Sequence, residues 1–502
     1  MMVDFSKMNT IPDFLEKNAQ QFPDKPALVF DKKSFSYQEL NSQSELVANF
    51  LLSKTKPQDV VAILLPNSAD FVISYFGVLK AGCIALLIPP NISDDKLKFQ
   101  VAKTQPNLIL TESKYSAKIE RANLGPKLEV IDTQTLLGIQ LSTDQQPRTI
   151  APTDTSTIIF TSGTTSEPKG VQLQHTNVVN ATKNIVEFLN LTPQEIDVNI
   201  SALSHSFGLG HLHCFLAVGG TTVLFRDAIN LKEILNAISA NHATTLGAVP
   251  AILRLLLNNF RTEFQEHGKS LRIVQTNTSP LEKELIEGIL NTLPSTNFSY
   301  YYGLTEASRS TFITFNQHAD KLSSIGQASP NVQVEVRDAR DQVCSPGELG
   351  EICIKGKMVI QEYWQNPSAS EKVKAGWFHS GDVGYMDPEG FLYYKGRYND
   401  LINVSGEKVS PEEVEDLIKK VPGVTDAAVI GIPDKILGEV IKAFISVSDK
   451  EFDVHLVTQL CRQKLESYKV PREVEIIKEI PRTDNGKLQR NKLKKSYTEL
   501  IY

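Results

Sequence analysis

The chain has 502 residues, 41% hydrophobic and 22% charged, with a net charge of −6. This is the composition of a globular protein long enough for two or more domains, and its acidic balance argues against nucleic acid as a partner. The N-terminus lacks the basic-then-apolar order of a signal peptide. The most apolar stretch, residues 71–90, is interrupted by Lys80 and is too short for a transmembrane segment. Five scattered cysteines without metal-ligand spacing favour a reduced, cytoplasmic setting.

Strand-like and helical patterns alternate through the first 330 residues. The apolar run at 60–65 predicts a strand, 69–80 a helix and 83–88 the next strand. Such alternation predicts an α/β fold of stacked layers with mostly parallel sheets. From about residue 331, short alternating segments lie between Gly and Pro turns, so residues 330–398 are expected to form a small barrel or meander.

A loop rich in hydroxyls and glycine follows the predicted strand at 155–160 and precedes an alternating strand that starts at Val171. Backbone N–H groups, hydroxyls and a cation are the groups that bind a polyphosphate. A Walker A loop is excluded, because Pro168 occupies its second glycine position and a strand follows where that motif needs a helix. The expected phosphate-binding residues are Thr161, Ser162, Gly163, Thr164, Thr165 and Lys169.

This loop resembles the signature of the AMP-forming adenylate ligases, which include acyl- and aryl-CoA synthetases, nonribosomal-peptide adenylation domains and firefly-type luciferases. The commonest version has Gly where this chain has Ser166. The resemblance extends in order over nearly the whole chain. It implies a large N-terminal AMP-binding domain at 1–398 and a small, mobile α+β lid at 399–502. It also implies ATP and Mg²⁺ as cofactors, and attack of a carboxylate on the α-phosphate to give an acyl-adenylate and pyrophosphate.

The segment Tyr301-Tyr-Gly-Leu-Thr-Glu306 matches the second motif of the superfamily. By resemblance, Tyr302 stacks on adenine beside Gly303, Thr305 bonds the α-phosphate, and Glu306 holds Mg²⁺. A carboxylate suits that role, since Mg²⁺ prefers hard oxygen ligands. Taken alone, the segment would also suit an aromatic core strand that ends in a glycine turn.

Two further motifs follow in the expected order. The resemblance implies that Asp382, in Gly376-Trp-Phe-His-Ser-Gly-Asp382, accepts both ribose hydroxyls, and two carboxylate oxygens suit a diol. It also implies that Arg397 contacts ribose or phosphate. The lid hinge then falls on Asn399, where most relatives have Asp or Lys; asparagine tolerates the unusual backbone angles that a hinge needs.

The C-terminal region begins with a helix-start signal, in which Ser410 caps, Pro411 takes the first helical position and Glu413 completes a capping box. Strands at 427–432 and 441–447 and a helix at 454–466 are expected to follow. Near the end, Asn485-Gly486 predicts a tight turn that presents Lys487. The resemblance implies that Lys487 bridges the substrate carboxylate and the α-phosphate.

The acid pocket is expected around Leu203-Ser-His-Ser-Phe-Gly208, which resembles acyl- and aryl-CoA ligases. His205 and Phe207 would line it, although His205 would also suit the core. Amino-acid-activating relatives place Asp at the position of Gly208, and a buried unpaired ammonium is costly. A neutral-tailed acid, such as a fatty or aryl acid, is therefore favoured. Thr278 and Ser279 replace a glycine-rich turn and would narrow this pocket or bond the substrate.

His205, His211 and His213 lie close in sequence, but no cysteine or carboxylate completes a metal site near them. The resemblance implies that the catalytic residues are Lys487, Thr305, Glu306 and His205. The acyl acceptor is expected to be CoA, with the phosphopantetheine of a separate carrier protein as the alternative. Three other readings remain open: luciferase-like oxidation of the adenylate, an inactive nucleotide-binding regulator, and an NTPase that releases orthophosphate.

Overall fold

The computed structural model describes residues 4–125, 128–137, 146–161, 167–277, 281–398, 400–404, 407–434, 438–449, 451–482 and 488–499. None of the helices within these ranges is both long and apolar enough to cross a membrane. Several predicted site residues lie outside the described residues: Ser162, Gly163, Thr164, Thr165, Thr278, Ser279, Asn399 and Lys487.

A six-stranded sheet has the order β6-β5-β3-β4-β7-β8, parallel except for the β7–β8 pair. Its central strands are buried on both faces: Val60, Ala62 and Leu64 pack on one side, and Val61 and Ile63 on the other. This explains why the sequence shows continuous apolar runs. The strands are β3 (Val60–Leu64), β4 (Ile84–Leu87), β5 (Leu108–Thr111), β6 (Glu129–Asp132), β7 (Thr155–Thr161) and β8 (Lys169–Gln174).

A nine-stranded sheet has the order β15-β14-β13-β12-β11-β9-β10-β1-β2, parallel in its centre and antiparallel at both edges. Its strands are β1 (Pro26–Phe30), β2 (Lys33–Ser36), β9 (Ile196–Asn199), β10 (Thr221–Leu224), β11 (Thr245–Gly247), β12 (Ile273–Asn277), β13 (Asn297–Leu304), β14 (Ala307–Thr314) and β15 (Gln327–Ala328). Together with the first sheet, it confirms the expected stack of mostly parallel α/β layers.

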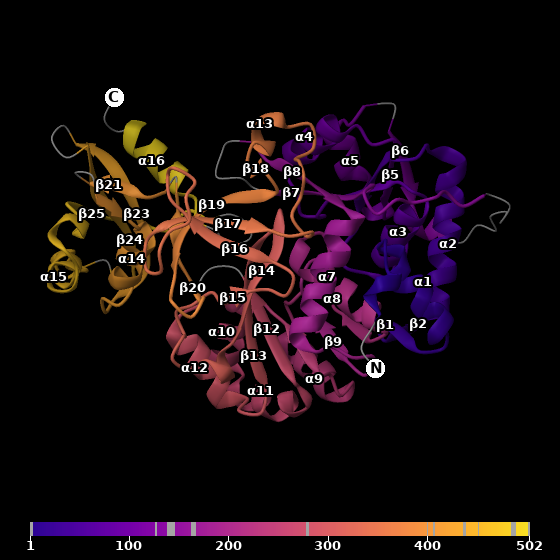
Figure 1. The fold of residues 1–502 in the computed structure, drawn as a ribbon, viewed down its shortest axis with the longest axis horizontal. Helices are drawn as coiled ribbons and strands as arrows, with labels where there is room; N and C mark the ends of the chain where they lie inside the picture. The colour runs from indigo at the N-terminus through magenta and orange to yellow at the C-terminus, as the bar shows by residue number, and fades with distance from the viewer. Residues whose placement is uncertain are drawn as a thin grey trace.

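Helices separate and cover these two sheets (Figure 1). Helices α3, α7 and α8 pack between the sheets, α4 and α5 cover the outer face of the six-stranded sheet, and α9 to α12 cover the outer face of the nine-stranded sheet. The helices of this region are α1 (Pro12–Gln21), α2 (Tyr37–Lys54), α3 (Ala69–Lys80), α4 (Asp94–Thr104), α5 (Ser116–Ala122), α6 (Thr133–Leu137), α7 (His175–Leu189), α8 (Ser206–Val218), α9 (Leu231–Ala240), α10 (Pro250–Asn259), α11 (Arg261–His267) and α12 (Lys283–Thr292).

A smaller antiparallel sheet forms where the barrel or meander was expected. Strand β19 pairs with β17, β18 and β20, and β16 pairs with β17. No pairing among the described residues closes these strands into a barrel, so the meander describes them better. Its elements are β16 (Gln333–Arg337), β17 (Gly350–Lys355), α13 (Pro367–Ser370), β18 (Val373–Lys374), β19 (Trp377–Met386) and β20 (Leu392–Arg397).

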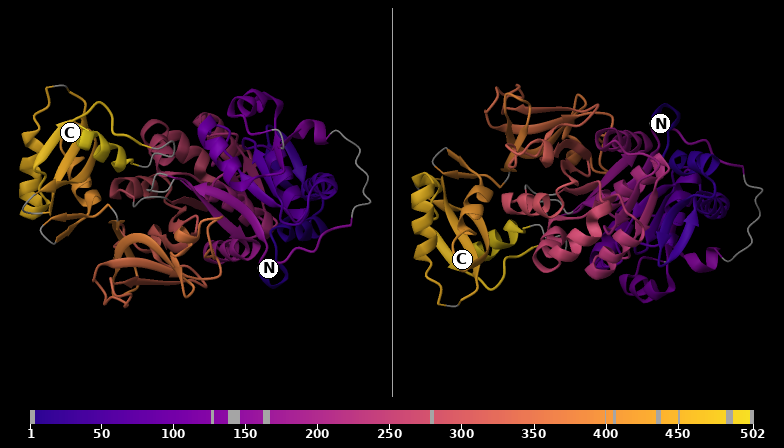
Figure 2. Two further views of the ribbon diagram at one scale, coloured as in Figure 1. Left: turned by 90° about the horizontal axis from the view of Figure 1, so that it is seen from above. Right: turned by 90° about the horizontal axis from the view of Figure 1, so that it is seen from below.

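The C-terminal unit lies at the end of the molecule opposite the N-terminal helices (Figure 2). Strands β23 and β24 bury both faces, one against α14 and α15 and the other against α16. Its elements are β21 (Ile402–Val404), β22 (Glu407–Val409), α14 (Pro411–Ile418), β23 (Val424–Asp434), β24 (Gly438–Val447), α15 (His455–Lys464), β25 (Glu473–Ile476) and α16 (Arg490–Glu499).

Only half of the expected capping box is made at the start of α14. The Ser410 hydroxyl accepts from the Glu413 backbone N–H at 3.4 Å, as predicted. The Glu413 carboxylate instead accepts from Lys469 Nζ at 2.9 Å. The prediction of a complete capping box was therefore wrong, because Glu413 forms an ion pair with Lys469, which is distant in the sequence, instead of closing the cap.

Candidate active site

The hairpin of β13 and β14 positions the second motif, with Thr305 and Glu306 at its tip. Consecutive tyrosines on β13 face opposite sides of the sheet, as strand geometry requires. Tyr302 packs with the core that includes the small meander sheet, whereas Tyr301 packs against Phe207 and α7–α8 side chains. The strand therefore separates two groups of functional residues.

Tyr302, Asp382 and Arg397 meet on the first side. The Tyr302 hydroxyl donates to Asp382 Oδ2 at 2.6 Å, and Arg397 Nε lies 2.7 Å from Asp382 Oδ1. Strand pairing sets Asp382 directly opposite Arg397. Burial raises the pKa of Tyr302 well above its usual value, and the Asp382 charge raises it further. The carboxylate is thus a buried, paired acceptor, and its contact with ribose hydroxyls stays a prediction.

Glu306 lies beside this trio, held by an aromatic residue that the sequence did not single out. The Tyr363 hydroxyl donates to Glu306 Oε1 at 2.8 Å. Lys169 Nζ lies 5.8 Å from the centre of the Tyr363 ring, which places the lysine of the phosphate loop next to Glu306. Thr161 pairs with Lys169 across β7 and β8, so these two residues bracket the loop.

Lys372 is a second cation that the sequence did not reveal. Its Nζ donates to the Ser380 carbonyl at 3.4 Å. Burial lowers its pKa, and the positive charges of Arg397 and Lys169 act in the same direction, while Glu306 opposes them. Three basic side chains, Lys169, Lys372 and Arg397, therefore surround one carboxylate, which is the charge distribution that a metal-bound polyphosphate needs.

Gly303 and Thr305 lie where the hairpin turns. An added Cβ at Gly303 would lie 2.5 Å from the Arg309 backbone nitrogen, so only glycine fits there. Thr305 is half-buried beside Glu306. The structure thus brings Gly303, Thr305 and Glu306 together with Tyr302 at one end of the sheet, where the resemblance places the nucleotide.

The expected acid-pocket residues lie at the first turn of α8. His205 is the N-cap residue and is half-buried. The Phe207 ring packs edge-on against His211 at 4.9 Å and tilted against Tyr301 at 5.9 Å. An added Cβ at Gly208 would lie 2.5 Å from the carbonyl oxygens of Ser201 and Ala202. No side chain fits at Gly208, which supports the argument against an aspartate that pairs a substrate ammonium.

The other two histidines of this helix face different partners. His211 Nδ1 lies 3.4 Å from Asp197, and His213 Nε2 lies 3.1 Å from the Tyr75 hydroxyl. Burial lowers the pKa of His213 to about 3, with a smaller contribution from Arg309. His213 is thus a neutral interior residue, while His211 faces the region around Tyr301.

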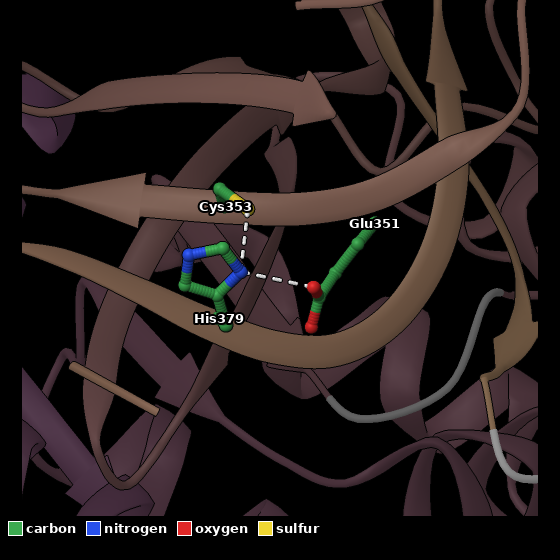
Figure 3. A group of neighbouring side chains, drawn as sticks. All are labelled: Glu351, Cys353 and His379. Atoms are coloured by element: carbon green, nitrogen blue, oxygen red, sulfur yellow. Dashed lines mark hydrogen bonds and ion pairs between the residues drawn. The ribbon is translucent and has the colours of Figure 1, made fainter. Parts of the chain in front are cut away.

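Glu351, Cys353 and His379 form a compact group next to Asp382 (Figure 3). His379 Nδ1 lies 2.9 Å from Glu351 Oε2 and 3.5 Å from Cys353 Sγ. Glu351 Oε1 accepts from the Gly381 backbone N–H at 2.9 Å. Burial, followed by the Glu351 charge, raises the pKa of Cys353 to about 12. These contacts fix the part of β19 that leads into Asp382.

An ion-pair cluster links the C-terminal segment to the predicted hinge region. Arg490 lies 3.3 Å from Asp400, 3.0 Å from Glu412 and 2.8 Å from Glu415. Burial lowers its pKa, but the three carboxylates outweigh burial and raise it above its usual value. The helix that follows Lys487 is thereby anchored to the residue that follows Asn399.

Comparison with known proteins agrees with this arrangement. Residues 15–364 match the AMP-binding enzyme family, and residues 413–487 match the AMP-binding enzyme C-terminal domain. The 2-succinylbenzoate–CoA ligase of Bacillus subtilis (strain 168) is 31% identical over 490 residues, covering 96% of this chain and 97% of that protein. The long-chain-fatty-acid–CoA ligase of Escherichia coli O157:H7 is 28% identical over 540 residues, covering 97% and 94%.

Solved structures show the same fold. The o-succinylbenzoate CoA synthetase of Bacillus subtilis in complex with its acyl-adenylate intermediate superimposes with a TM-score of 0.87 at 29% identity, covering 96% of this chain and 98% of that one. Its complex with ATP and magnesium ion gives a TM-score of 0.87 at 28% identity, covering 96% and 99%. The chain therefore belongs to the AMP-binding enzyme family and is an AMP-forming acid–thiol ligase.

Proposed function

We propose that the protein condenses ATP with a carboxylic acid of the fatty or aryl class and passes the acyl group from the adenylate to CoA. The observation that carries the proposal is the convergence of charged residues from the three sheets of the N-terminal region: Lys169 of β8, Glu306 of the β13–β14 hairpin, and the paired Asp382 and Arg397 of β19 and β20. The family resemblance gives each of these residues a role in binding ATP or its magnesium ion. The two cations suit the phosphates, and the two carboxylates suit the ion and the ribose hydroxyls.

In this proposal the chain's own groups work mainly by position and charge. Tyr302 and Asp382 hold the nucleoside, Arg397 contacts ribose or phosphate, and Thr305 donates to the α-phosphate. Lys487 bridges the attacking carboxylate and the α-phosphate oxygens, where charge concentrates in the transition state.

Glu306 suits a magnesium ion, because it is a buried carboxylate already oriented by the Tyr363 hydroxyl. When bound, the ion would neutralise charge on the phosphates. The remaining phosphate contacts fall to Thr161, Ser162, Gly163, Thr164, Thr165 and Lys169. His205, Phe207, Gly208, Thr278 and Ser279 line the acid pocket.

Three finer points belong to the same proposal. Residues 1–398 form the AMP-binding domain, and residues 399–502 form a lid that turns about Asn399 between the two half-reactions. CoA is the acceptor because the relatives are named as CoA ligases; a carrier-protein pantetheine is the alternative. The location is cytoplasmic.

Acid-dependent exchange of labelled pyrophosphate into ATP tests the first half-reaction across fatty and aryl acids. Exchange should require an acid, and adding CoA should convert acid and ATP into acyl-CoA, AMP and pyrophosphate. Glu306→Gln should lower the exchange rate by about 10²–10³-fold, whereas Glu284→Gln, on the exposed face of α12, should not change it. Release of orthophosphate instead of pyrophosphate would refute the proposal.

A further inference from the structure

A recess lies on the Tyr301 side of β13, beside the expected acid-pocket residues of α8. The recess is narrow and partly open to solvent. Apolar side chains, mainly of α7 and α8, form most of its wall, and its polar wall includes His211, Thr245, Gln275 and Arg309. We call this space the acid recess. Its mixed lining of apolar and polar side chains suits an acyl group that carries a polar end.

Arg309 is the unusual residue of this recess. It is only 3% exposed, although arginine is almost never buried without a charged partner. Its φ of 58° lies in the left-handed region, which a side chain such as arginine adopts at a cost. An added Cβ at Gly210 would overlap the guanidinium, so α8 carries a helix-weakening glycine where the guanidinium lies. The buried guanidinium of Arg309 is thus accommodated at the expense of an unfavourable backbone angle at Arg309 and of a glycine inside α8.

The hydrogen bonds of Arg309 leave one edge of the guanidinium open. Nη1 donates to the Ser206 carbonyl at 2.9 Å and to the Ser308 hydroxyl at 2.6 Å. The guanidinium carbon Cζ lies 4.9 Å from the centre of the Tyr301 ring. Nη2 donates one hydrogen, to the Phe207 carbonyl at 3.3 Å. Nε is buried and has no hydrogen-bond partner among the described residues. Nε and Nη2 form the edge that binds a carboxylate through two parallel hydrogen bonds.

No ion pair to Arg309 is found within the described ranges. The acidic side chain of this region, Asp197, does not pair with Arg309: Thr245 donates to its Oδ1 at 2.6 Å and His211 Nδ1 lies 3.4 Å away, while Oδ2 has no hydrogen-bond partner among the described residues. Two more buried nitrogens, Gln275 Nε2 and His211 Nε2, also lack a partner in the described part of the chain. Buried polar groups are normally satisfied, so the two unpartnered donors, Arg309 Nε and Gln275 Nε2, point to a ligand with acceptor oxygens.

We propose that Arg309 selects the substrate by binding a second carboxylate at the inner end of the acid recess. Gln275 Nε2 adds a hydrogen bond to the same group. The substrate is thus a compact dicarboxylic acid, aliphatic or aryl, whose other carboxylate is activated near His205. This inference rests on the proposed function, and it replaces the neutral tail that Gly208 alone suggested. Gly208 excludes a counter-charge for an ammonium, whereas Arg309 supplies one for an anion.

The test compares acids that differ only in the second carboxylate. Aliphatic and aryl dicarboxylic acids, their monomethyl esters and the matching monocarboxylic acids are each assayed by pyrophosphate exchange with the full chain. At least one dicarboxylic acid should exceed its own monoester by about 100-fold in kcat/KM, because a site built to bond a polar group rejects analogues that lack it. Exchange with monocarboxylic acids but with no dicarboxylic acid would overturn the inference and leave the proposed function intact.

Variants separate recognition from folding. Arg309→Met should lower kcat/KM for the preferred dicarboxylic acid by about 100-fold and leave its monoester nearly unchanged. Gly210→Ala keeps every charge and favours the helix, but displaces the guanidinium, so it should lose the same preference. The control is Gly288→Ala on α12, whose added Cβ faces the flexible Leu257 side chain; it should keep the preference. Equal losses for diacid and monoester in both Arg309→Met and Gly210→Ala would overturn the assignment.

Discussion

The two faces of β13 differ in how completely the protein satisfies its own polar groups. On the Tyr302 face, Asp382 is paired with Arg397 and a tyrosine hydroxyl, and Glu306 accepts from Tyr363. On the Tyr301 face, Arg309 and Gln275 retain donors with no partner among the described residues. If the proposed function holds, the Tyr302 face is organised in advance for the nucleotide, and the Tyr301 face is completed by the acid substrate.

The largest effect is expected from Lys487→Ala, which tests whether a cation from the C-terminal segment completes the nucleotide side. Adenylate formation should fall by about 10³-fold, because charge in the transition state loses its stabilising partner. Thioester formation from supplied acyl-AMP should stay close to the wild-type rate. Separate assays of the two half-reactions check this, and equal losses in both would contradict the role.

Arg397→Met tests whether the Tyr302 face depends on charge pairing. The substitution leaves Asp382, whose side chain is 2% exposed, without its cation, and should lower the free energy of unfolding by about 3–5 kcal/mol. The matched control is Arg254→Met, which breaks an exposed pair with Glu282 and should cost about 0–1 kcal/mol. Urea denaturation measures both, and a similar small loss for both variants would show that the buried pair adds nothing.

Removing the hydroxyls of the two adjacent tyrosines compares the faces directly. Tyr302→Phe deletes a hydrogen bond to a buried carboxylate and should cost about 1.5–3 kcal/mol. Tyr301→Phe deletes only a bond from Asn277 Nδ2 to a neutral oxygen and should cost about 0.5–1.5 kcal/mol. Thermal and urea unfolding of the Tyr302→Phe and Tyr301→Phe variants measures the two losses of stability. A larger loss for Tyr301→Phe would reverse the proposed difference between the faces.

The sequence was sufficient to predict the site residues that lie within short, recognisable motifs. Tyr302, Glu306, Asp382 and Arg397 were each found within a short stretch, and the structure brings them together. Tyr363 and Lys372 were missed because they reach the site from the loop before α13 and from the turn between α13 and β18, without any recognisable spacing. Arg309 lies only three residues after Glu306, and its clue was a single charge in a strand of otherwise uncharged residues.

Other details depend on tertiary contacts that local patterns do not contain. Glu413 was expected to close a capping box, but Lys469 reaches it from a later turn. The fold layers were predictable, since their strands are apolar on both faces and alternate with helices. The separation of Tyr301 from Tyr302 follows from strand geometry once the strand is known. The residues that each tyrosine contacts could not be predicted, because they come from strands and helices that are distant in the sequence.

The smallest predicted effect concerns His213, the buried histidine of α8. His213 has a folded-state pKa of about 3, far below the usual 6.5, so its stability contribution is complete above pH 6.5 and is lost as the pH falls. Between pH 7 and pH 6 this amounts to about 0.7 kcal/mol. His213→Gln should remove that part of the pH dependence of unfolding, whereas His242→Gln, in an exposed turn, should retain it. An unchanged pH dependence in His213→Gln would contradict the neutral interior assignment.

The most direct test of the account is the product balance of a single reaction with α-labelled ATP, magnesium, CoA and one acid that supports exchange. AMP, pyrophosphate and acyl-CoA should form in equal amounts, and none of them should form when the acid is omitted. Formation of ADP and orthophosphate, or of AMP without acid, would contradict the assignment of this site to acid activation.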